Sequence, residues 1–204
     1  MQASSHYELA CCFLPYFPGW SLPERFAFLF GSVEPDINCL TYLHGIPAGD
    51  GLHGHNYAQV LPRIDRLARL LGRQGQWHPL DCYRLGKLAH YVADAFTLPH
   101  NPNFSGDMRA HIRYEAQLAA YFHARLPDAR PPHGLSGCVP PASPDGLPEL
   151  LRWRHRLYLS AVPGVENDAF FILEAAQAVA MVFAPDGAPV PQPHGTGVLG
   201  GVFR

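Results

Sequence analysis

The stretch LGKLAHYVADAFTLPHNPNFSGDMRAHIRYE, residues 85–115, decides the fold because it spans the end of one helix and the start of another. Apolar residues recur at helical spacing as far as Leu98, and Pro99 then ends the first helix. Gly106 leads into a second helix, which we expect from Met108 to about residue 126. The stretch therefore predicts two helices joined by a turn.

Ligand-type side chains occupy regular positions in this stretch. His90 and Asp94 are four residues apart, and so are His111 and Glu115. Residues i and i+4 lie on one face of a helix, so each pair can direct two ligand atoms at one point. His100 lies between the pairs in a predicted loop. Imidazole and carboxylate are common ligands of catalytic zinc, so the spacing predicts a metal site with more than one ion allowed.

Each pair taken alone has a simpler interpretation, which is a buried histidine hydrogen-bonded to a carboxylate one turn away. The third histidine, at a helix end stopped by proline, favours the metal site for both pairs. Carboxylates can also bridge two ions, which in two-metal hydrolases lie roughly 3.5–4 Å apart.

Composition indicates an ordinary folded domain. The chain has 204 residues, of which 48% are apolar and 16% charged, which is typical of a globular protein and argues against disorder. The net charge of −2 gives no basic field for nucleic acid. The five cysteines are an odd number without a C-x-x-C spacing, so a disulfide framework and a cysteine zinc ribbon are not expected.

The remaining pattern is helical throughout. No segment shows sustained β alternation, so we expect an all-α, single-domain helical bundle of about six to eight helices. We assign residues 1–185 to the domain and the Gly/Pro-rich residues 186–204 to a tail, with a long loop over 127–148. Besides the two helices above, with the first extending over 80–98, the predicted helices cover residues 5–14, 22–30, 56–71, 148–161 and 166–183.

Targeting signals are not expected. The start MQASSHYEL has no basic region or long apolar run, so we expect no signal peptide and a cytoplasmic location. The longest apolar run, over 169–184, is shorter than the roughly 20 residues that span a bilayer.

Several motifs of other enzyme classes are missing from the sequence. It contains no Glu-x-x-His, which di-iron bundles need, and no H-E-x-x-H of metalloproteases. It also lacks G-x-S-x-G and a Walker motif. The missing motifs argue against those enzyme classes.

The order of these residues resembles the zinc-dependent phospholipase C family, whose fold is shared by P1-type nucleases. The resemblance covers roughly residues 5 to 120. It rests on an early histidine, a Pro-Asp dipeptide, a loop histidine, and the spacings His-x-x-x-Asp-x5-His and His-x-x-x-Glu. In this chain these are His6, Pro35-Asp36, a histidine near residue 55, His90, Asp94, His100, His111 and Glu115.

The resemblance implies a helical bundle with three zinc ions that cleaves phosphodiester or phosphomonoester bonds. It assigns Asp36, a loop histidine, His90 and Asp94 to one ion, and it makes Asp94 a bridge to a second ion that also takes His6. Asp36 matches the aspartate proposed as general base in the family. The third ion would be held by His100, His111 and Glu115.

Two features depart from the family pattern. The loop histidine is ambiguous: His55 begins a helix-like segment and is favoured over His53, with His44 third. In secreted members, the amino and carbonyl groups of an N-terminal tryptophan complete one zinc site. This chain has Met1, five residues before His6, so the resemblance predicts an incomplete or differently completed site there.

Other residues have simpler interpretations. We expect surface or loop positions for the histidines without a partner in register, and packing roles for the tyrosines beside proposed ligands. Arg109 and Arg113 are expected on a solvated helix face. The histidines are His78, His123, His133, His155 and His194, and the tyrosines are Tyr7, Tyr57, Tyr91 and Tyr114.

The sequence thus predicts a metal-dependent phosphoric ester hydrolase, similar to phospholipase C, that uses two or three zinc ions and metal-activated water. Other divalent metals also suit such ligands. A small-molecule or lipid phosphoester is the expected substrate, and nucleic acid is disfavoured. The alternatives are a helical metal-binding interaction domain without turnover, and a nuclease or phosphatase on the same fold. The oligomeric state stays open.

Overall fold

The computed structural model describes residues 1–38, 57–72, 76–125 and 143–185, and within them the chain is all-helical. These residues form seven α-helices and two short 3-10 helices, with no strand among them, so the expected fold class is confirmed. The elements are α1 (Ala3–Phe13), η1 (Leu14–Tyr16), α2 (Leu22–Ile37), α4 (Tyr57–Leu71), α5 (Pro79–Ala95), η2 (Leu98–His100), α6 (Met108–Arg125), α7 (Leu147–Ser160) and α8 (Val165–Phe183).

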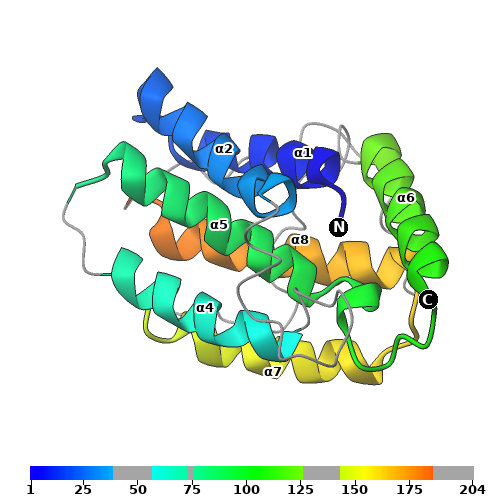
Figure 1. Cartoon of the computed structure of the whole chain (residues 1–204). Helices are drawn as coiled ribbons and strands as arrows, with labels where there is room; N and C mark the ends of the chain where they lie inside the picture. Colours follow the sequence, from blue (N-terminus) through cyan, green and yellow to red (C-terminus); the bar gives the residue numbers. More distant parts are fainter. Residues whose placement is uncertain (39–56, 73–75, 126–142, 186–204) are drawn as a thin grey trace, which may run out of the picture.

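Helix α5 lies at the centre of the bundle. Figure 1 shows α1 and α2 on one side of it, α4 and α7 on the other, and α8 behind it, with α6 across the end where α5 finishes. Packing against α2, α4 and α8 buries α5 on most sides, including Leu88, Val92 and the polar His90 and Asp94. The central position explains why its polar residues can serve an internal site.

Two glycines let α2 and α5 approach each other closely. A side chain on Gly31 would collide with the backbone carbonyl of Tyr83, and one on Gly86 would collide with that of Phe28. Only glycine allows such close backbone contact between helices without pushing them apart. This approach brings the C-terminal end of α2 against the second half of α5.

Helix α2 is longer than the sequence predicted. We expected this helix to end at residue 30, whereas α2 continues through Pro35 to Ile37. Proline removes one helical hydrogen bond, here the one to the carbonyl of residue 31, and crowds the preceding turn. The helix continues beyond it, because the Asn38 N–H donates to the Glu34 carbonyl at 2.9 Å. Asp36 therefore lies on the last turn of a helix.

The other expected helices agree with the structure to within about three residues at each end, the usual uncertainty of such boundaries. Helix α1 begins at Ala3, two residues before the expected start, with Gln2 as its N-cap residue. Most of the expected loop over 127–148 and the tail 186–204 lie outside the described residues. None of the described helices is long and apolar enough to cross a membrane.

Candidate metal centre

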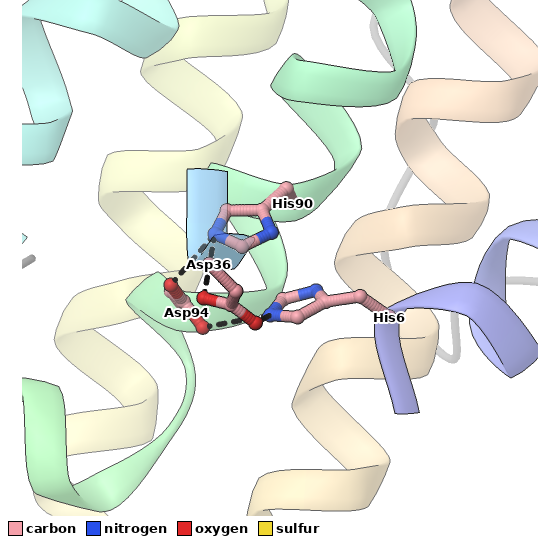
Figure 2. A group of neighbouring side chains, drawn as sticks. All are labelled: His6, Asp36, His90 and Asp94. Carbon is pink, nitrogen blue, oxygen red and sulfur yellow. Dashed lines mark hydrogen bonds and ion pairs between the residues drawn. The ribbon is translucent and has the colours of Figure 1, made fainter. Parts of the chain in front are cut away.

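Three helices bring four ligand-type side chains together beside the middle of the bundle. We call His6 of α1, Asp36 of α2, and His90 and Asp94 of α5 the first group, and their ligand atoms all lie within 4.8 Å of one another. Figure 2 shows the four side chains converging from these helices. The i, i+4 pair supplies two members, and the close approach of α2 and α5 adds Asp36.

Distances in the first group match the spacing of ligands around one small ion. The Nε2 atoms of His6 and His90 each lie 3.2 Å from an oxygen of Asp94. The same nitrogens lie 3.8 and 3.7 Å from the oxygens of Asp36. Ligand atoms placed about 2.0–2.1 Å from a tetrahedral zinc ion are roughly 3.3 Å apart, so these distances are of the size expected between ligands that share an ion.

The tautomer of His90 supports this interpretation. Its Nδ1 lies 2.9 Å from the carbonyl oxygen of Ser32, which can only accept, so Nδ1–H is the donor. In the neutral ring, Nε2 then carries a lone pair and faces the carboxylates of Asp36 and Asp94. A ring nitrogen that faces two carboxylates is satisfied by a metal ion or by a proton, and Asp94 and Asp36 outweigh burial and raise the pKa of His90. A backbone partner on the other ring nitrogen is typical of metal-binding histidines.

Buried carboxylate oxygens also fit a cation. Within the described residues, Oδ2 of Asp36 and Oδ2 of Asp94 are buried and accept no hydrogen bond. A buried charged oxygen without a donor is costly, unless a proton or metal ion neutralises it. The two orphaned oxygens therefore favour an ion in the first group over a network of hydrogen bonds alone.

Three further side chains form a second group at the end of α5. His100 of η2 and His111 and Glu115 of α6 have their ligand atoms within 4.8 Å of one another. Oε1 of Glu115 lies 2.9 Å from Nε2 of His111 and 3.3 Å from Nε2 of His100. The two imidazole rings meet edge to face, with centroids 5.2 Å apart. The predicted pair on α6 and the predicted loop histidine thus converge on one point.

The amino group of Met1 lies between the two groups. Its nitrogen is 2.8 Å from Oδ1 of Asp94, 3.2 Å from Nε2 of His100 and 3.0 Å from Oε1 of Glu115. Burial disfavours its charge, but Asp94 and Glu115 outweigh burial and raise the pKa of the amino group to about 10. The charged amino group of Met1 therefore lies where the neighbouring carboxylates favour a cation. This position is also the zinc site that the resemblance predicts to be incomplete or differently completed.

Electrostatics keep His6, His100 and Asp94 in forms that bind metal. Burial, and then the charge of His90, lower the pKa of His6 to about 3, so its ring is neutral at physiological pH. Burial also lowers the pKa of His100. Burial opposes ionisation of Asp94, but the Met1 ammonium and the neighbouring histidines overcome it and hold its pKa well below the usual range. Neutral imidazole and ionised carboxylate are the metal-binding forms.

Asp36 is the most exposed member of the first group. Its side chain is 17% exposed, whereas those of His6, His90 and Asp94 are almost completely buried. Burial, and then the charge of Asp94, raise the pKa of Asp36 to about 6. A carboxylate with a pKa near neutrality and some access to solvent is suited to accept a proton.

The structure places the remaining predicted residues as follows. The loop histidine cannot be assigned from the structure, because His55, His53 and His44 lie outside the described residues. Of the histidines expected at the surface or in loops, His78 and His123 are exposed, whereas His133 and His194 lie outside the described residues.

The expectation for His155 is wrong. Its side chain is buried, stacks on Tyr57 with ring centroids 3.4 Å apart, and lies 2.7 Å from Oδ1 of Asn101. The histidine belongs to the core packing beside the turn that follows α5. Its apolar surroundings come from distant helices, so the lack of a local partner could not indicate its burial.

Sequence reasoning also missed Asp168, a buried carboxylate on α8 that binds Leu98, Tyr114 and Tyr158. Tyr114 had been assigned to packing, and its hydroxyl donates to Asp168 at 2.8 Å. An acidic residue inside the apolar pattern of α8 is the one sequence signal that could have indicated it.

The fold and the two groups define an all-α protein with a histidine–carboxylate centre of the kind that holds zinc. Residues 21–159, more than half of the chain, match the family described as zinc dependent phospholipase C. The chain belongs to this family. Comparisons with curated proteins and with solved structures found no match.

Proposed function

We propose that this chain is a zinc-dependent phosphoric ester hydrolase of the phospholipase C type. The observation that carries the proposal is the arrangement of the two groups, which place seven ligand-type side chains at adjoining points of a chain from this family. Oδ1 of Asp94 lies 2.8 Å from the Met1 nitrogen, which in turn lies 3.0 Å from Oε1 of Glu115, so the two groups adjoin.

The residues present fit the proposed ions. We assign His6, Asp36, His90 and Asp94 to two ions, with Asp94 as the bridging carboxylate, and the loop histidine His55 as a further ligand. The opposed directions of the two Asp94 oxygens support the bridging role, because Oδ2 faces His90 while Oδ1 faces His6. The second group, made of His100, His111 and Glu115, would hold a third ion.

Each part of the centre has a role in this proposal. When bound, zinc ions polarise a phosphoryl oxygen and lower the pKa of water toward about 7. Asp36 orients that water and accepts its proton, which its partial exposure and raised pKa support. His90 is held in orientation by the Ser32 carbonyl, so its Nε2 stays directed at the centre. No nucleophilic side chain is required.

The substrate we propose is a small-molecule or lipid phosphoester. Membership of the phospholipase C family supports a phosphoester as substrate. The family alone does not specify which kind of phosphoester this chain hydrolyses. Phosphodiesters are the first class to test, because the family is named for a phosphodiesterase activity.

The direct test combines metal analysis with hydrolysis of a chromogenic phosphodiester. The purified chain should contain two or three equivalents of zinc and should hydrolyse the ester. The variant His90→Ala/Asp94→Ala should lose zinc from the first group and lose activity, because it removes the two buried ligands of α5.

A matched control is His123→Ala, since His123 lies on α6 with its side chain 84% exposed and outside both groups. This variant should keep both zinc and activity. A chain without zinc, or a His90→Ala/Asp94→Ala variant that retains all of it, would show that the proposal is wrong. Full zinc content without turnover on any phosphoester would instead favour a non-catalytic metal-binding domain.

A further inference from the structure

A buried carboxylate outside both groups connects the elements that carry the second group. Asp168 lies in the first turn of α8, and its side chain is completely buried. Its Oδ2 accepts hydrogen bonds from the N–H of Leu98 at 2.7 Å and from the hydroxyl of Tyr114 at 2.8 Å. Its Oδ1 accepts one from the hydroxyl of Tyr158 at 2.9 Å.

Two of these donors lead directly to ligand-type residues. Leu98 is the first residue of η2, which ends at His100. Tyr114 immediately precedes Glu115 on α6. A single oxygen atom of Asp168 therefore fixes the position of η2 relative to α6, which are the two elements that supply the second group. Tyr158 lies on α7, which carries none of the residues of the second group.

Stability alone does not explain a charged residue at this position. Burying a carboxylate costs several kcal/mol, and well-packed apolar residues often serve stability equally well. Three donors compensate the charge of Asp168, and although burial raises its pKa to about 6, the group is ionised at neutral pH. An ionised carboxylate can only accept, so all three donors have one defined geometry around it.

We propose that Asp168 is a positioning residue, which holds His100 and the His111/Glu115 pair at the separation that the second group needs to bind its ion. The inference rests on the proposed function, because it assumes that the second group binds zinc. Asp168 contacts none of the three ligand-type residues and acts through the backbone of η2 and the side chain of Tyr114.

The turn after α5 does not depend on Asp168 alone. The side-chain amide of Asn101 donates to the carbonyls of Ala95 and Thr97 at 3.0 and 2.9 Å, and its oxygen contacts His155. These bonds keep the turn folded when the bonds to Asp168 change. The loss of one donor to Asp168 should therefore alter the alignment of η2 and α6 without unfolding the chain.

The two tyrosines provide a matched comparison. Tyr114→Phe and Tyr158→Phe each remove one hydroxyl that donates to the same carboxylate at nearly the same distance. Each should reduce stability by a similar amount, because each variant loses one hydrogen bond of the same kind. Only Tyr114→Phe releases an element that carries ligand-type residues. If the role of Asp168 were purely structural, the two variants would change zinc binding equally.

The experiment titrates each purified, chelator-stripped chain with zinc against a chromogenic competitor. The His111→Ala variant identifies which binding step belongs to the second group. Tyr114→Phe should weaken that step by about tenfold, the lower end of the effect of outer-shell partners, whereas Tyr158→Phe should change it by less than about threefold. Asp168→Asn should retain more affinity than Asp168→Ala, because its amide oxygen can still accept from the N–H of Leu98.

Equal weakening in Tyr114→Phe and Tyr158→Phe, or none in either, would overturn the role of Asp168 while leaving the zinc site in place. So would an Asp168→Asn variant that binds no better than Asp168→Ala. An unmodified chain that binds no zinc would overturn the proposed function and this inference together.

Discussion

At the scale of single residues, hydrogen bonding and burial define what each side chain of the centre can do. The Ser32 carbonyl fixes the tautomer of His90 and so directs the lone pair of Nε2 at two carboxylates. Burial keeps the His6 ring neutral. Asp36 differs from both, since it is partly exposed and has a pKa of about 6, which separates the ligand that is also suited to proton transfer from the ligands suited only to holding an ion.

Asp36→Asn tests this separation of roles. The amide cannot accept a proton, so we expect activity on a chromogenic phosphodiester to fall by about 10²–10⁴, as is usual when a general base is lost. His6, His90 and Asp94 remain, so elemental analysis should still find zinc in the first group. The control is Asp107→Asn, since Asp107 only caps the N–H of Ala110 on the surface and asparagine caps equally well. Unchanged activity in Asp36→Asn would exclude Asp36 as the base.

The buried His155 makes stability depend on pH. Burial lowers its pKa from 6.5 to about 4, so between these values the unfolded chain binds a proton that the folded chain does not. Stability conferred by the neutral ring is therefore complete above pH 6.5 and is lost as the pH falls toward 4. A shift of this size corresponds to about 2–3 kcal/mol at the lower pH.

Denaturant unfolding in the presence of a chelator at pH 7.5 and 4.5 measures this effect. We expect the stability advantage of the unmodified chain over His155→Gln to shrink by about 2 kcal/mol between the two pH values. His123→Gln should show no such change, because that side chain is 84% exposed. A constant difference for His155→Gln would show that His155 titrates normally.

The local part of the centre could be predicted from the sequence, and the rest could not. Spacing of four residues within one helix was sufficient for His90 with Asp94 and for His111 with Glu115, and their side chains do converge. The roles of His155 and Asp168 depend on side chains from distant helices, which no local pattern records. The family resemblance, rather than spacing, supplied His6 and Asp36.

At the scale of elements, the approach of α2 to α5 positions Asp36. The sequence predicted helices at both places but ended the first at residue 30, because Pro35 is normally a helix stop signal. The structure places Pro35 in the final turn of α2, where it removes the hydrogen bond to the carbonyl of residue 31 without ending the helix. The extra two turns carry Asp36 to within 3.7 Å of His90. The position at which a helix ends near a proline thus depends on tertiary contacts, here the contact of α2 with α5.

The glycines at this contact give a test at the same scale. In Gly86→Ala, the new methyl group would collide with the Phe28 carbonyl and approach the backbone nitrogen of Ser32 to 2.8 Å. Overpacking of this kind costs about 1–3 kcal/mol, more than the roughly 1 kcal/mol that alanine adds to helix propensity. We expect lower stability and weaker zinc binding in the first group, because α2 and therefore Asp36 must move away from α5.

Denaturant unfolding and competitive zinc titration measure the two effects. Gly19→Ala is the matched control, since no atom lies within 4 Å of the position of its new side chain. That variant should differ from the unmodified chain by less than about 0.5 kcal/mol. If Gly86→Ala behaved as Gly19→Ala does, the close approach of α2 and α5 would not be needed for the site.

At the scale of the whole molecule, the centre joins elements from distant parts of the sequence. Its residues come from α1, α2, α5, η2 and α6, and they lie between positions 6 and 115. Metal ions held by such a centre bind the folded chain and not the separated helices. Binding free energy therefore adds to folding free energy, and it offsets the repulsion among Asp36, Asp94 and Glu115.

Removal of metal should consequently lower thermal stability. An ion at about 1,000 times its dissociation constant stabilises the folded chain by about 4 kcal/mol. For a chain of this size 1 kcal/mol corresponds to about 2–4 °C, so a chelator should lower the melting temperature by on the order of 10 °C. Differential scanning calorimetry with and without chelator measures the shift, and added zinc should restore the melting temperature.

The shift should be smaller in His90→Ala/Asp94→Ala, which keeps only the second group intact, and unchanged in His123→Ala. Equal melting temperatures with and without chelator would mean that the five elements are held together by packing alone.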